Sequence, residues 1–181
     1  MACDNMIFGK CFEEIWYRPA PGGADQIHTN NRQKGKAKTM YRILLVDDEI
    51  LVRDAIKENI DWKSMDCQLV GDCENGKQAA DFVKSHPVDI VLTDILMPYM
   101  DGMELSHFLH DNYPEIVIVI FSGFGEFEYA KKAIQYNVSE YMLKPVTAME
   151  LREVIGKMKE KVDQIRKEKR KMESLTRTSE N

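Results

Sequence analysis

The sequence predicts an α/β fold, a doubly wound five-stranded parallel sheet with helices on both faces. Five short apolar runs rich in β-branched residues alternate with segments of helical length. These runs are almost wholly apolar rather than alternating, as strands of a parallel sheet covered on both faces must be. The chain has 181 residues, 44% of them hydrophobic and 30% charged, which allows one globular domain with appendages.

The predicted strands follow one another in a region that begins at Met40. They are Ile43–Val46, Gln68–Gly71, Val88–Leu92, Ile116–Phe121 and Tyr141–Leu143. Residues 1–39 are expected to form a flexible N-terminal extension, because Pro19 and Pro21 precede a polar stretch without hydrophobic period. A packing role for the apolar residues near Trp16 is the alternative. The sequence thus divides into this extension, a domain over 40–158 and a C-terminal helical extension over 159–181.

Capping signals indicate where the helices begin. Capping boxes are predicted at Asp101 with Glu104 and at Thr147 with Glu150, and a looser version at Asn75 with Gln78. Val146 and Leu151 are placed to form a hydrophobic staple for the last helix, and Asn137 to end the preceding one.

Charge and composition exclude several classes of function. Residues 40–145 contain nine Lys and Arg against nineteen Asp and Glu, so we expect no direct binding of nucleic acid by this segment. The longest apolar run, Ile116–Phe121, is too short to span a membrane, and no signal peptide is evident, which favours a cytoplasmic location. The four cysteines form no C-x-x-C pair, and the four histidines are scattered, so neither suggests a metal site.

Reactive side chains follow four of the five predicted strands. Asp47 and Asp48 follow the first, Asp94 the third, Ser122 the fourth and Lys144 the fifth. Carboxyl ends of parallel strands share one edge of a sheet, so these residues are expected to gather there. Clustered carboxylates recruit a hard cation, and oxygen ligands on flexible loops favour Mg²⁺. Carboxylate, metal, hydroxyl and amine together suit phosphoryl transfer onto an aspartate.

Each of these residues also has a simpler interpretation. An acidic triplet such as Asp47–Glu49 is usually a solvated turn, Asp94 alone could cap a strand end, Ser122 could form a turn, and Lys144 could be an ordinary surface residue. Their joint placement at successive strand ends favours a common site. The Gly123–Gly125 segment is too short for a dinucleotide-binding fingerprint, so flavin or nucleotide binding is poorly supported.

The motifs at these strand ends resemble those of the receiver domain of bacterial two-component response regulators. They are VDDE at Val46–Glu49, DIVLTDILMPYMDG at Asp89–Gly102, Ser122–Gly123 and Lys144–Pro145. The resemblance covers about residues 41–160 and implies a flavodoxin-like sheet in strand order 2-1-3-4-5. The stretch FSGFGEFEYAK at Phe121–Lys131 is similar, more narrowly, to receivers attached to AraC-type transcriptional regulators.

The resemblance also implies a role for each site residue. Asp94 would be the phosphoacceptor and Asp48 a direct Mg²⁺ ligand, while Asp47 would support these ligands or contact the ion through a water. The carbonyl of Leu96 would complete the metal site. Ser122 would be the switch hydroxyl, Tyr141 the aromatic switch, and Lys144 the amine facing the phosphoryl group, followed by a cis Pro145. For Tyr141 an ordinary half-buried strand aromatic is the alternative.

The function implied is a signalling receiver, not an enzyme, that accepts a phosphoryl group from a sensor histidine kinase. Transcription regulation through a DNA-binding domain absent from this sequence would be its output. The alternatives are a stand-alone receiver that binds another protein, an Asp-nucleophile Mg²⁺ phosphohydrolase, and a similar fold that only binds partners. The residues two past Asp94 and Ser122 are Leu96 and Phe124, which cannot orient a water, so slow loss of phosphate is expected.

The C-terminal segment shows a 3.5-residue apolar repeat. Its members are Ala148, Leu151, Ile155, Met158, Val162, Ile165 and Met172, broken at Lys169. This pattern predicts a coiled-coil seam beyond about Lys159 and hence a homodimer through the last helix. A solvated helix held by pairs such as Glu153–Lys157 and Asp163–Lys167 is the alternative.

Overall fold

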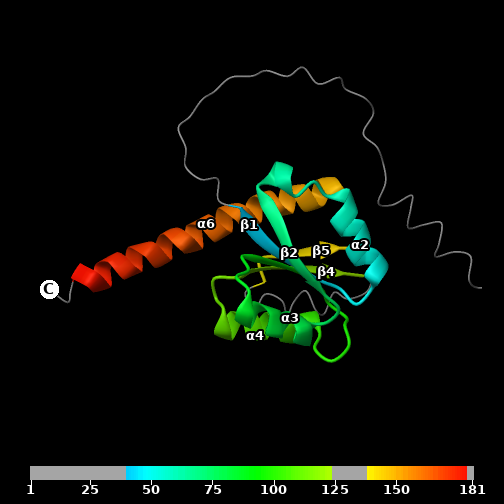
Figure 1. The fold of residues 1–181 in the computed structure, drawn as a ribbon, viewed down its shortest axis with the longest axis horizontal. Coiled ribbons are helices and arrows are strands. Elements are labelled where there is room, and N and C mark those ends of the chain that lie inside the picture. Colours follow the sequence, from blue (N-terminus) through cyan, green and yellow to red (C-terminus); the bar gives the residue numbers. More distant parts are fainter. Residues whose placement is uncertain (1–39, 124–137, 179–181) are drawn as a thin grey trace, which may run out of the picture.

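The structure, a computed structural model, describes residues 40–123 and 138–178 (Figure 1). Within these ranges the elements alternate between strand and helix. The strands are β1 (Tyr41–Val46), β2 (Cys67–Cys73), β3 (Ile90–Asp94), β4 (Val117–Ser122) and β5 (Glu140–Leu143). The helices are α2 (Ile50–Asn59), α3 (Gly76–Ser85), α4 (Gly102–Asn112) and α6 (Ala148–Thr178), with a short 3₁₀ helix, η1, at Lys63–Met65.

All five strands belong to one parallel sheet in the order β2-β1-β3-β4-β5. This confirms the predicted fold class and the strand order that the resemblance implied. β3, at the centre, is buried along its whole length, because both of its faces are covered by helices. Every end of the five predicted strands lies within two residues of the corresponding observed end.

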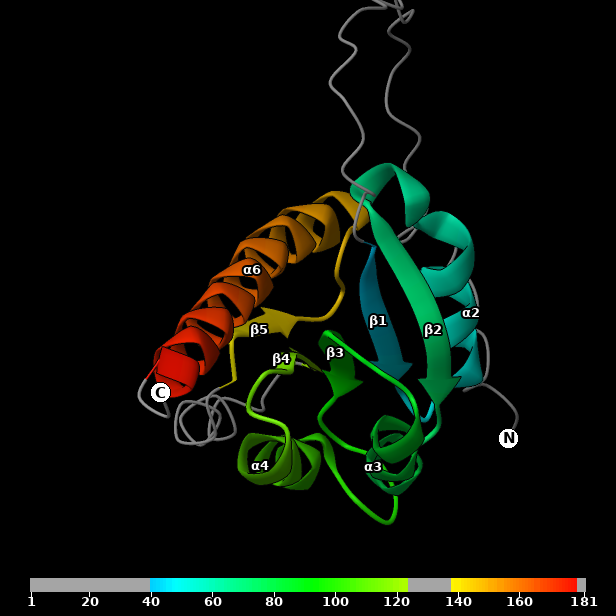
Figure 2. The same cartoon turned by 60° about the vertical axis from the view of Figure 1, so that its left-hand side comes forward.

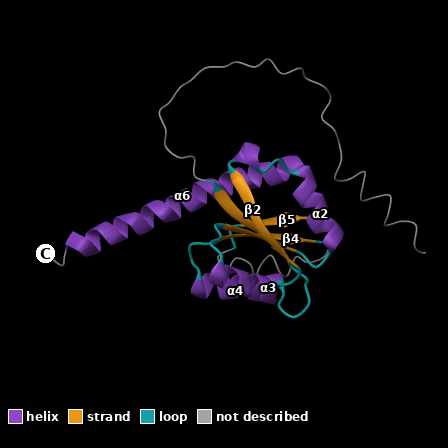
Figure 3. Ribbon diagram, in the orientation of Figure 1, coloured by secondary structure: helices purple, strands orange, loops and turns teal. Residues whose placement is uncertain are grey.

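The described helices form two layers, one on each face of the sheet (Figures 2 and 3). Helices α2 and α6 pack on one face, where Ile56 and Leu151 join Ile43 and Leu92 in a single apolar core. Helices α3 and α4 cover the other face through a second core that includes Val91. Successive strand residues therefore supply opposite cores, as the period of two in a strand requires.

The predicted caps at the starts of α3 and α4 are present. The Asp101 carboxylate accepts the backbone N–H of Glu104 at 2.8 Å, and the Glu104 side chain accepts that of Asp101 at 3.0 Å. At α3, Asn75 accepts the N–H of Gln78, while the Gln78 side chain accepts the N–H of Glu74, one residue before the cap. The predicted helix end at Asn137 lies outside the described residues.

Helix α6 begins as the sequence predicts. The Thr147 hydroxyl accepts the N–H of Glu150 at 3.2 Å, and the Glu150 carboxylate accepts the N–H of Thr147 at 2.8 Å, which completes a capping box. The staple residues Val146 and Leu151 are both buried in the same core. From this start the helix runs without interruption for 31 residues.

The apolar seam of α6 serves the domain core for longer than the sequence suggested. Val162 is buried, and Ile165 packs against the same core, so within the described ranges the part of the seam without a core contact begins several residues after Lys159. Beyond that point α6 extends past the sheet (Figure 1), and there Met172 and Leu175 are exposed. The division of the chain at residue 158 stays a prediction, but it falls within one continuous helix.

A cluster of polar contacts, here called the α6 clasp, holds this helix at the amino-terminal edge of the sheet. Asp89, which immediately precedes β3, pairs with Arg42 and with Arg166 of α6, each at 2.8 Å. The Tyr41 hydroxyl donates to Asp163 at 2.7 Å, so Asp163 contacts a strand residue where the sequence suggested an ion pair with Lys167. A groove of about 670 Å³ runs along α6 beside these residues.

Within the two described ranges, none of the helices combines the length and the apolar character needed to cross a membrane.

Candidate functional site

Strand register brings two of the predicted aspartates side by side. Val46 of β1 pairs with Thr93 of β3, and Asp47 and Asp94 are the next residue of each chain segment. Both are largely buried, Asp47 completely. The sheet therefore presents two adjacent carboxylates at the carboxyl ends of the neighbouring strands β1 and β3.

The Lys144 ammonium joins these carboxylates from the end of β5. Its Nζ lies 2.6 Å from Oδ1 of Asp94 and 3.0 Å from Oδ2 of Asp47. The peptide bond between Lys144 and Pro145 is cis, as the resemblance implied. One cation thus contacts two buried anions, and three strands that are far apart in sequence meet at one point.

Burial and charge act against each other at this cluster. Burial raises the pKa of both Asp47 and Asp94 above the usual carboxyl value, although Lys144 opposes the shift. For Lys144, burial acts to lower the pKa, but the two carboxylates outweigh it and raise the pKa of the ammonium. The nearby charge of Asp48 raises the pKa of Asp94 further. The site therefore favours the binding of additional positive charge.

The loop that follows Asp94 is fixed closely around it. The N–H of Leu96 donates to Oδ2 of Asp94 at 3.1 Å, so both carboxylate oxygens have donors. A Cβ added to Gly102 would lie 2.1 Å from the carbonyl oxygen of Asp94, so only glycine permits this approach of α4. Tyr99, in the same loop, has a positive φ of 67°. The phosphoacceptor predicted from the sequence is thus rigidly placed.

Ser122 and Tyr141, the predicted switch pair, are in direct contact. The Tyr141 hydroxyl donates to Oγ of Ser122 at 2.6 Å, and Ser122 donates to the carbonyl of Gly123 at 3.2 Å. Ser122 is one residue beyond Phe121, the register partner of Asp94, and is completely buried. The hydroxyl of Ser122 and the ring of Tyr141 therefore form a hydrogen-bonded pair beside β3, and their switch role stays a prediction.

Asp48 differs from the other two aspartates because its side chain is exposed. In the described ranges no three His, Cys, Asp or Glu side chains are grouped closely enough to hold a metal ion. The chemistry of the donors nevertheless fits Mg²⁺, since Asp47, Asp48 and Asp94 offer only oxygen and two of them are buried carboxylates of raised pKa. The position of the Leu96 carbonyl relative to such an ion stays a prediction.

Arg53 of α2 is a member of this site that sequence reasoning missed. Its guanidinium is almost completely buried and donates to the backbone carbonyl of Asp47 at 2.6 Å. The sequence signal that could have indicated its burial is the position of this basic residue between Val52 and Ile56, which form the apolar stripe of the helix.

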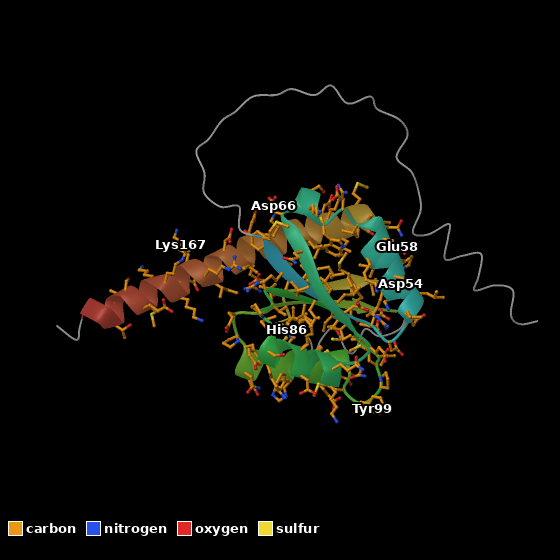
Figure 4. All side chains as sticks on the ribbon, viewed as in Figure 1. Asp54, Glu58, Asp66, His86, Tyr99 and Lys167 are labelled. Carbon is orange, nitrogen blue, oxygen red and sulfur yellow. The ribbon has the colours of Figure 1, made fainter. Side chains whose placement is uncertain are left out.

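Most of the large exposed apolar side chains lie near the carboxyl ends of three strands. In the described ranges six of the eight lie at or shortly after the carboxyl end of β1, β3 or β5: Ile50, Leu51, Leu96, Tyr99, Leu143 and Met149. Figure 4 shows Tyr99, which is 87% exposed, at the outer end of its loop. We call these six residues the apolar rim.

Comparison with known proteins identifies the family of this chain. The model of the response regulator receiver domain matches residues 43–156. The chain is 40% identical over 124 residues to the transcriptional regulatory protein YesN of Bacillus subtilis (strain 168), a match that covers 66% of this chain and 34% of YesN. It is 29% identical over 119 residues to the transcriptional regulatory protein HptR of Staphylococcus aureus (strain NCTC 8325 / PS 47), covering 66% of this chain and 46% of HptR.

Solved structures show the same fold. The receiver domain of AraT, a response regulator from Geobacillus stearothermophilus, superposes with a TM-score of 0.65 at 37% identity, covering 69% of this chain and 97% of that one. A two-component transcriptional regulator AraC from Clostridium phytofermentans has a TM-score of 0.65 at 34% identity, covering 70% and 98%. The chain spans a third to a half of the length of the curated relatives named here. With its parallel sheet and its motifs at four strand ends, the chain belongs to the response regulator receiver domain family.

Proposed function

We propose that this chain is a phosphorylation-dependent receiver that takes a phosphoryl group from a sensor histidine kinase onto Asp94. The observation that carries the proposal is the contact of one ammonium, Lys144, with both Asp94 and Asp47. An amine held against the acceptor carboxylate is placed to balance the charge of a phosphoryl group bound there.

The transfer requires Asp94 to act as a nucleophile. One of its carboxylate oxygens forms the new bond to phosphorus, while the bond between phosphorus and the imidazole nitrogen of the kinase breaks and the electron pair leaves with that nitrogen. The imidazole then takes up a proton. Lys144 supports the anionic form of Asp94, and the N–H of Leu96 orients its carboxylate. The chain accepts and slowly loses a phosphoryl group rather than turning over a substrate.

Mg²⁺ is the cofactor that we propose for this step, held by Asp48 and Asp94 with Asp47 in support and the Leu96 carbonyl as a further ligand. Bound there, it would neutralise charge on the transferred group. The exposed carboxylate of Asp48 is free of the packing that restrains Asp47, so it is the member that can turn toward an ion.

Phosphorylation is proposed to act on Ser122 and Tyr141. A phosphoryl group adds negative charge and strong acceptor oxygens, which attract the hydroxyl of Ser122. The 2.6 Å hydrogen bond links that hydroxyl directly to Tyr141, so a movement of one changes the hydrogen bonding of the other. The surface around β5 and the start of α6 would then report the phosphorylated state.

The apolar rim supports a protein rather than a small molecule as the physiological donor. Large apolar side chains exposed near a cluster of charged residues are typical of a protein-binding surface. A kinase bound to the apolar rim would hold its phosphohistidine close to Asp94.

For the output we propose transcription regulation through a DNA-binding domain outside this sequence, because the relatives YesN and HptR are named as transcriptional regulatory proteins.

We also propose a homodimer through the end of α6. Its exposed apolar side chains, Met172 and Leu175, are few, so the association would be weak in this chain alone. Sedimentation of the native chain and of Leu175→Glu tests this, with a purely monomeric native chain at high concentration arguing against it.

The experiment that tests the function is intact mass measurement after incubation with acetyl phosphate and Mg²⁺. We expect one added phosphoryl group on the native chain, none on Asp94→Asn, and a strongly reduced rate for Lys144→Met. Equal labelling of native chain and Asp94→Asn would exclude Asp94 as the acceptor. Continued release of phosphate from a simple phosphomonoester would instead favour a phosphohydrolase.

A further inference from the structure

Arg53 makes three polar contacts from within α2. Its Nη1 donates to the carbonyl oxygen of Asp47 at 2.6 Å, and its Nε pairs with Asp72 of β2 at 2.9 Å. Its Nη2 lies 3.9 Å from Glu74. The side chain is only 6% exposed, so the guanidinium spans three segments beneath the surface.

Such burial of an arginine is costly unless its donors are satisfied. A planar guanidinium with several fixed donors can bind a carboxylate and a carbonyl at once, which a lysine cannot do with the same geometry. Here the carboxylate of Asp72 balances the charge, and the Nη1 group donates to the backbone carbonyl of Asp47.

The contact with the carbonyl completes the restraint of Asp47. Its N–H donates to the carbonyl of Cys73 at 3.1 Å, its Oδ1 accepts the N–H of Glu49 at 2.9 Å, and its Oδ2 accepts from Lys144. Arg53 holds the one remaining polar atom. No side chain caps the N–H groups at the start of α2, so a cap adds no restraint to this loop.

The carbonyl of Asp47 belongs to the peptide plane that leads to Asp48. Because a peptide bond is planar, fixing the direction of the carbonyl fixes the plane, and with it the point from which the Asp48 side chain departs. Asp48 itself is exposed, and burial does not restrain its carboxylate. The backbone is therefore what determines where that carboxylate can be presented.

We propose that Arg53 is a positioning residue for the Mg²⁺ site, which presents Asp48 to the ion by holding the carbonyl of Asp47. The proposal rests on the proposed function, since it takes Asp48 to be a metal ligand. It assigns no contact between Arg53 and the ion or the phosphoryl group. Loss of a residue that orients a ligand typically lowers metal affinity about 10- to 100-fold.

The test is a calorimetric titration with Mg²⁺ alone, without a phosphodonor. The variants are Arg53→Met, which removes the donors and keeps much of the apolar volume, and Arg53→Lys, which keeps the charge. Arg42→Met is the matched control, because Arg42 also pairs with a buried aspartate but lies at the opposite edge of the sheet. Circular dichroism of each variant establishes that it is folded.

We expect Arg53→Met to weaken Mg²⁺ binding at least about tenfold, Arg53→Lys to lie between it and the native chain, and Arg42→Met to match the native affinity. With acetyl phosphate, the Mg²⁺ concentration for half-maximal phosphorylation should rise, while the rate at saturating Mg²⁺ changes far less. An arginine that only stabilised the fold would not raise the Mg²⁺ requirement more than it lowers the rate at saturating Mg²⁺.

Unchanged Mg²⁺ affinity in a folded Arg53→Met chain would overturn the inference and leave the proposed function intact. If that variant does not fold, native affinity in Arg53→Lys would do the same. Equal weakening by Arg42→Met would show a general effect of lost stability and would also overturn it. Absence of Mg²⁺ binding by the native chain would instead contradict the metal site of the proposed function itself.

Discussion

Arg166 of α6 pairs at 2.8 Å with Asp89, the residue immediately before the strand that ends in Asp94. The last helix is therefore tied to the base of β3, at the edge of the sheet opposite the candidate site. Arg42 pairs with the same carboxylate, and together the two arginines outweigh the effect of burial and hold the pKa of Asp89 below its usual value. The α6 clasp thus fixes the point at which the helix leaves the domain.

Removal of Arg166 is expected to loosen α6 near that point. In Arg166→Met the backbone amides of residues 160–170 should exchange with solvent about tenfold faster, because one charged hydrogen bond to Asp89 is lost. Lys167→Met is the control, since Lys167 lies exposed on the same helix (Figure 4). Equal protection in both variants, measured by hydrogen exchange, would show that the clasp does not stabilise the helix.

Gly102 is expected to be essential for the placement of Asp94. Gly102→Ala introduces a Cβ against the Asp94 carbonyl, which should destabilise the protein by about 1–3 kcal/mol or more and slow phosphorylation. Gly156→Ala is the matched control, because nothing lies within 4 Å of the added atom in α6. It should stabilise the chain by up to about 1 kcal/mol. Urea denaturation of both variants decides, and a tolerated Gly102→Ala would contradict the close approach.

Ionisation of Asp94 and of Asp89 should change the free energy of unfolding in opposite directions. Burial raises the pKa of Asp94 in the folded chain, so its ionisation costs stability as the pH rises through that value. Asp94→Asn should therefore be more stable than the native chain at pH 7, on the order of 1 kcal/mol, with the advantage shrinking toward pH 4.

Asp89→Asn provides the opposite sign. The pKa of Asp89 is lowered in the folded chain, so its contribution is present above the unfolded carboxyl pKa of about 3.9 and is lost as the pH falls through the folded value. This variant should be less stable at pH 7, with the deficit decreasing in acid. Thermal denaturation of both variants at pH 7 and at about pH 3, below the unfolded carboxyl pKa, measures the difference. A destabilised Asp94→Asn at pH 7 would mean that its pairing with Lys144 outweighs burial.

Leu96→Asn should speed the loss of phosphate from Asp94. Leu96 is half exposed at the mouth of the site, and its backbone N–H already donates to the Asp94 carboxylate. An amide side chain there can orient a water for attack on phosphorus, whereas leucine cannot. Decay of the phosphorylated mass after removal of the donor gives the rate. Leu51→Asn, on the same rim but in α2, is the control, and equal decay in all three chains would refute a role for position 96.

Most of the fold was predictable because its signals are local. Uninterrupted apolar runs such as that around Ile118 exist only where both faces of a strand are covered, and the capping pair Asp101 and Glu104 lies within one helical turn. The gathering of Asp47, Asp94 and Lys144 followed from the same reasoning, since it needs only parallel strands. The roles of these residues came from the family resemblance and stay proposals.

The parts that the sequence did not predict depend on contacts between distant segments. Nothing in the spacing of Arg53 indicates that it binds the carbonyl of Asp47, and nothing in the α6 repeat separates Val162, which faces the core, from Met172, which does not. The same holds for Arg166 and Asp89, 77 residues apart. Periodicity reports which side of a helix is apolar, but not what covers it.

Phosphorylation of Asp94 is tested by finding which residue carries the phosphoryl group. The native chain would be treated with acetyl phosphate and Mg²⁺, reduced with borohydride, which converts an acyl phosphate to an alcohol, and digested for peptide mass mapping. We expect Asp94, and no other aspartate, to be converted to homoserine, and omission of Mg²⁺ to abolish the conversion. Reduction at Asp47 or Asp48, or no reduction while Mg²⁺ binding is measurable, would contradict it.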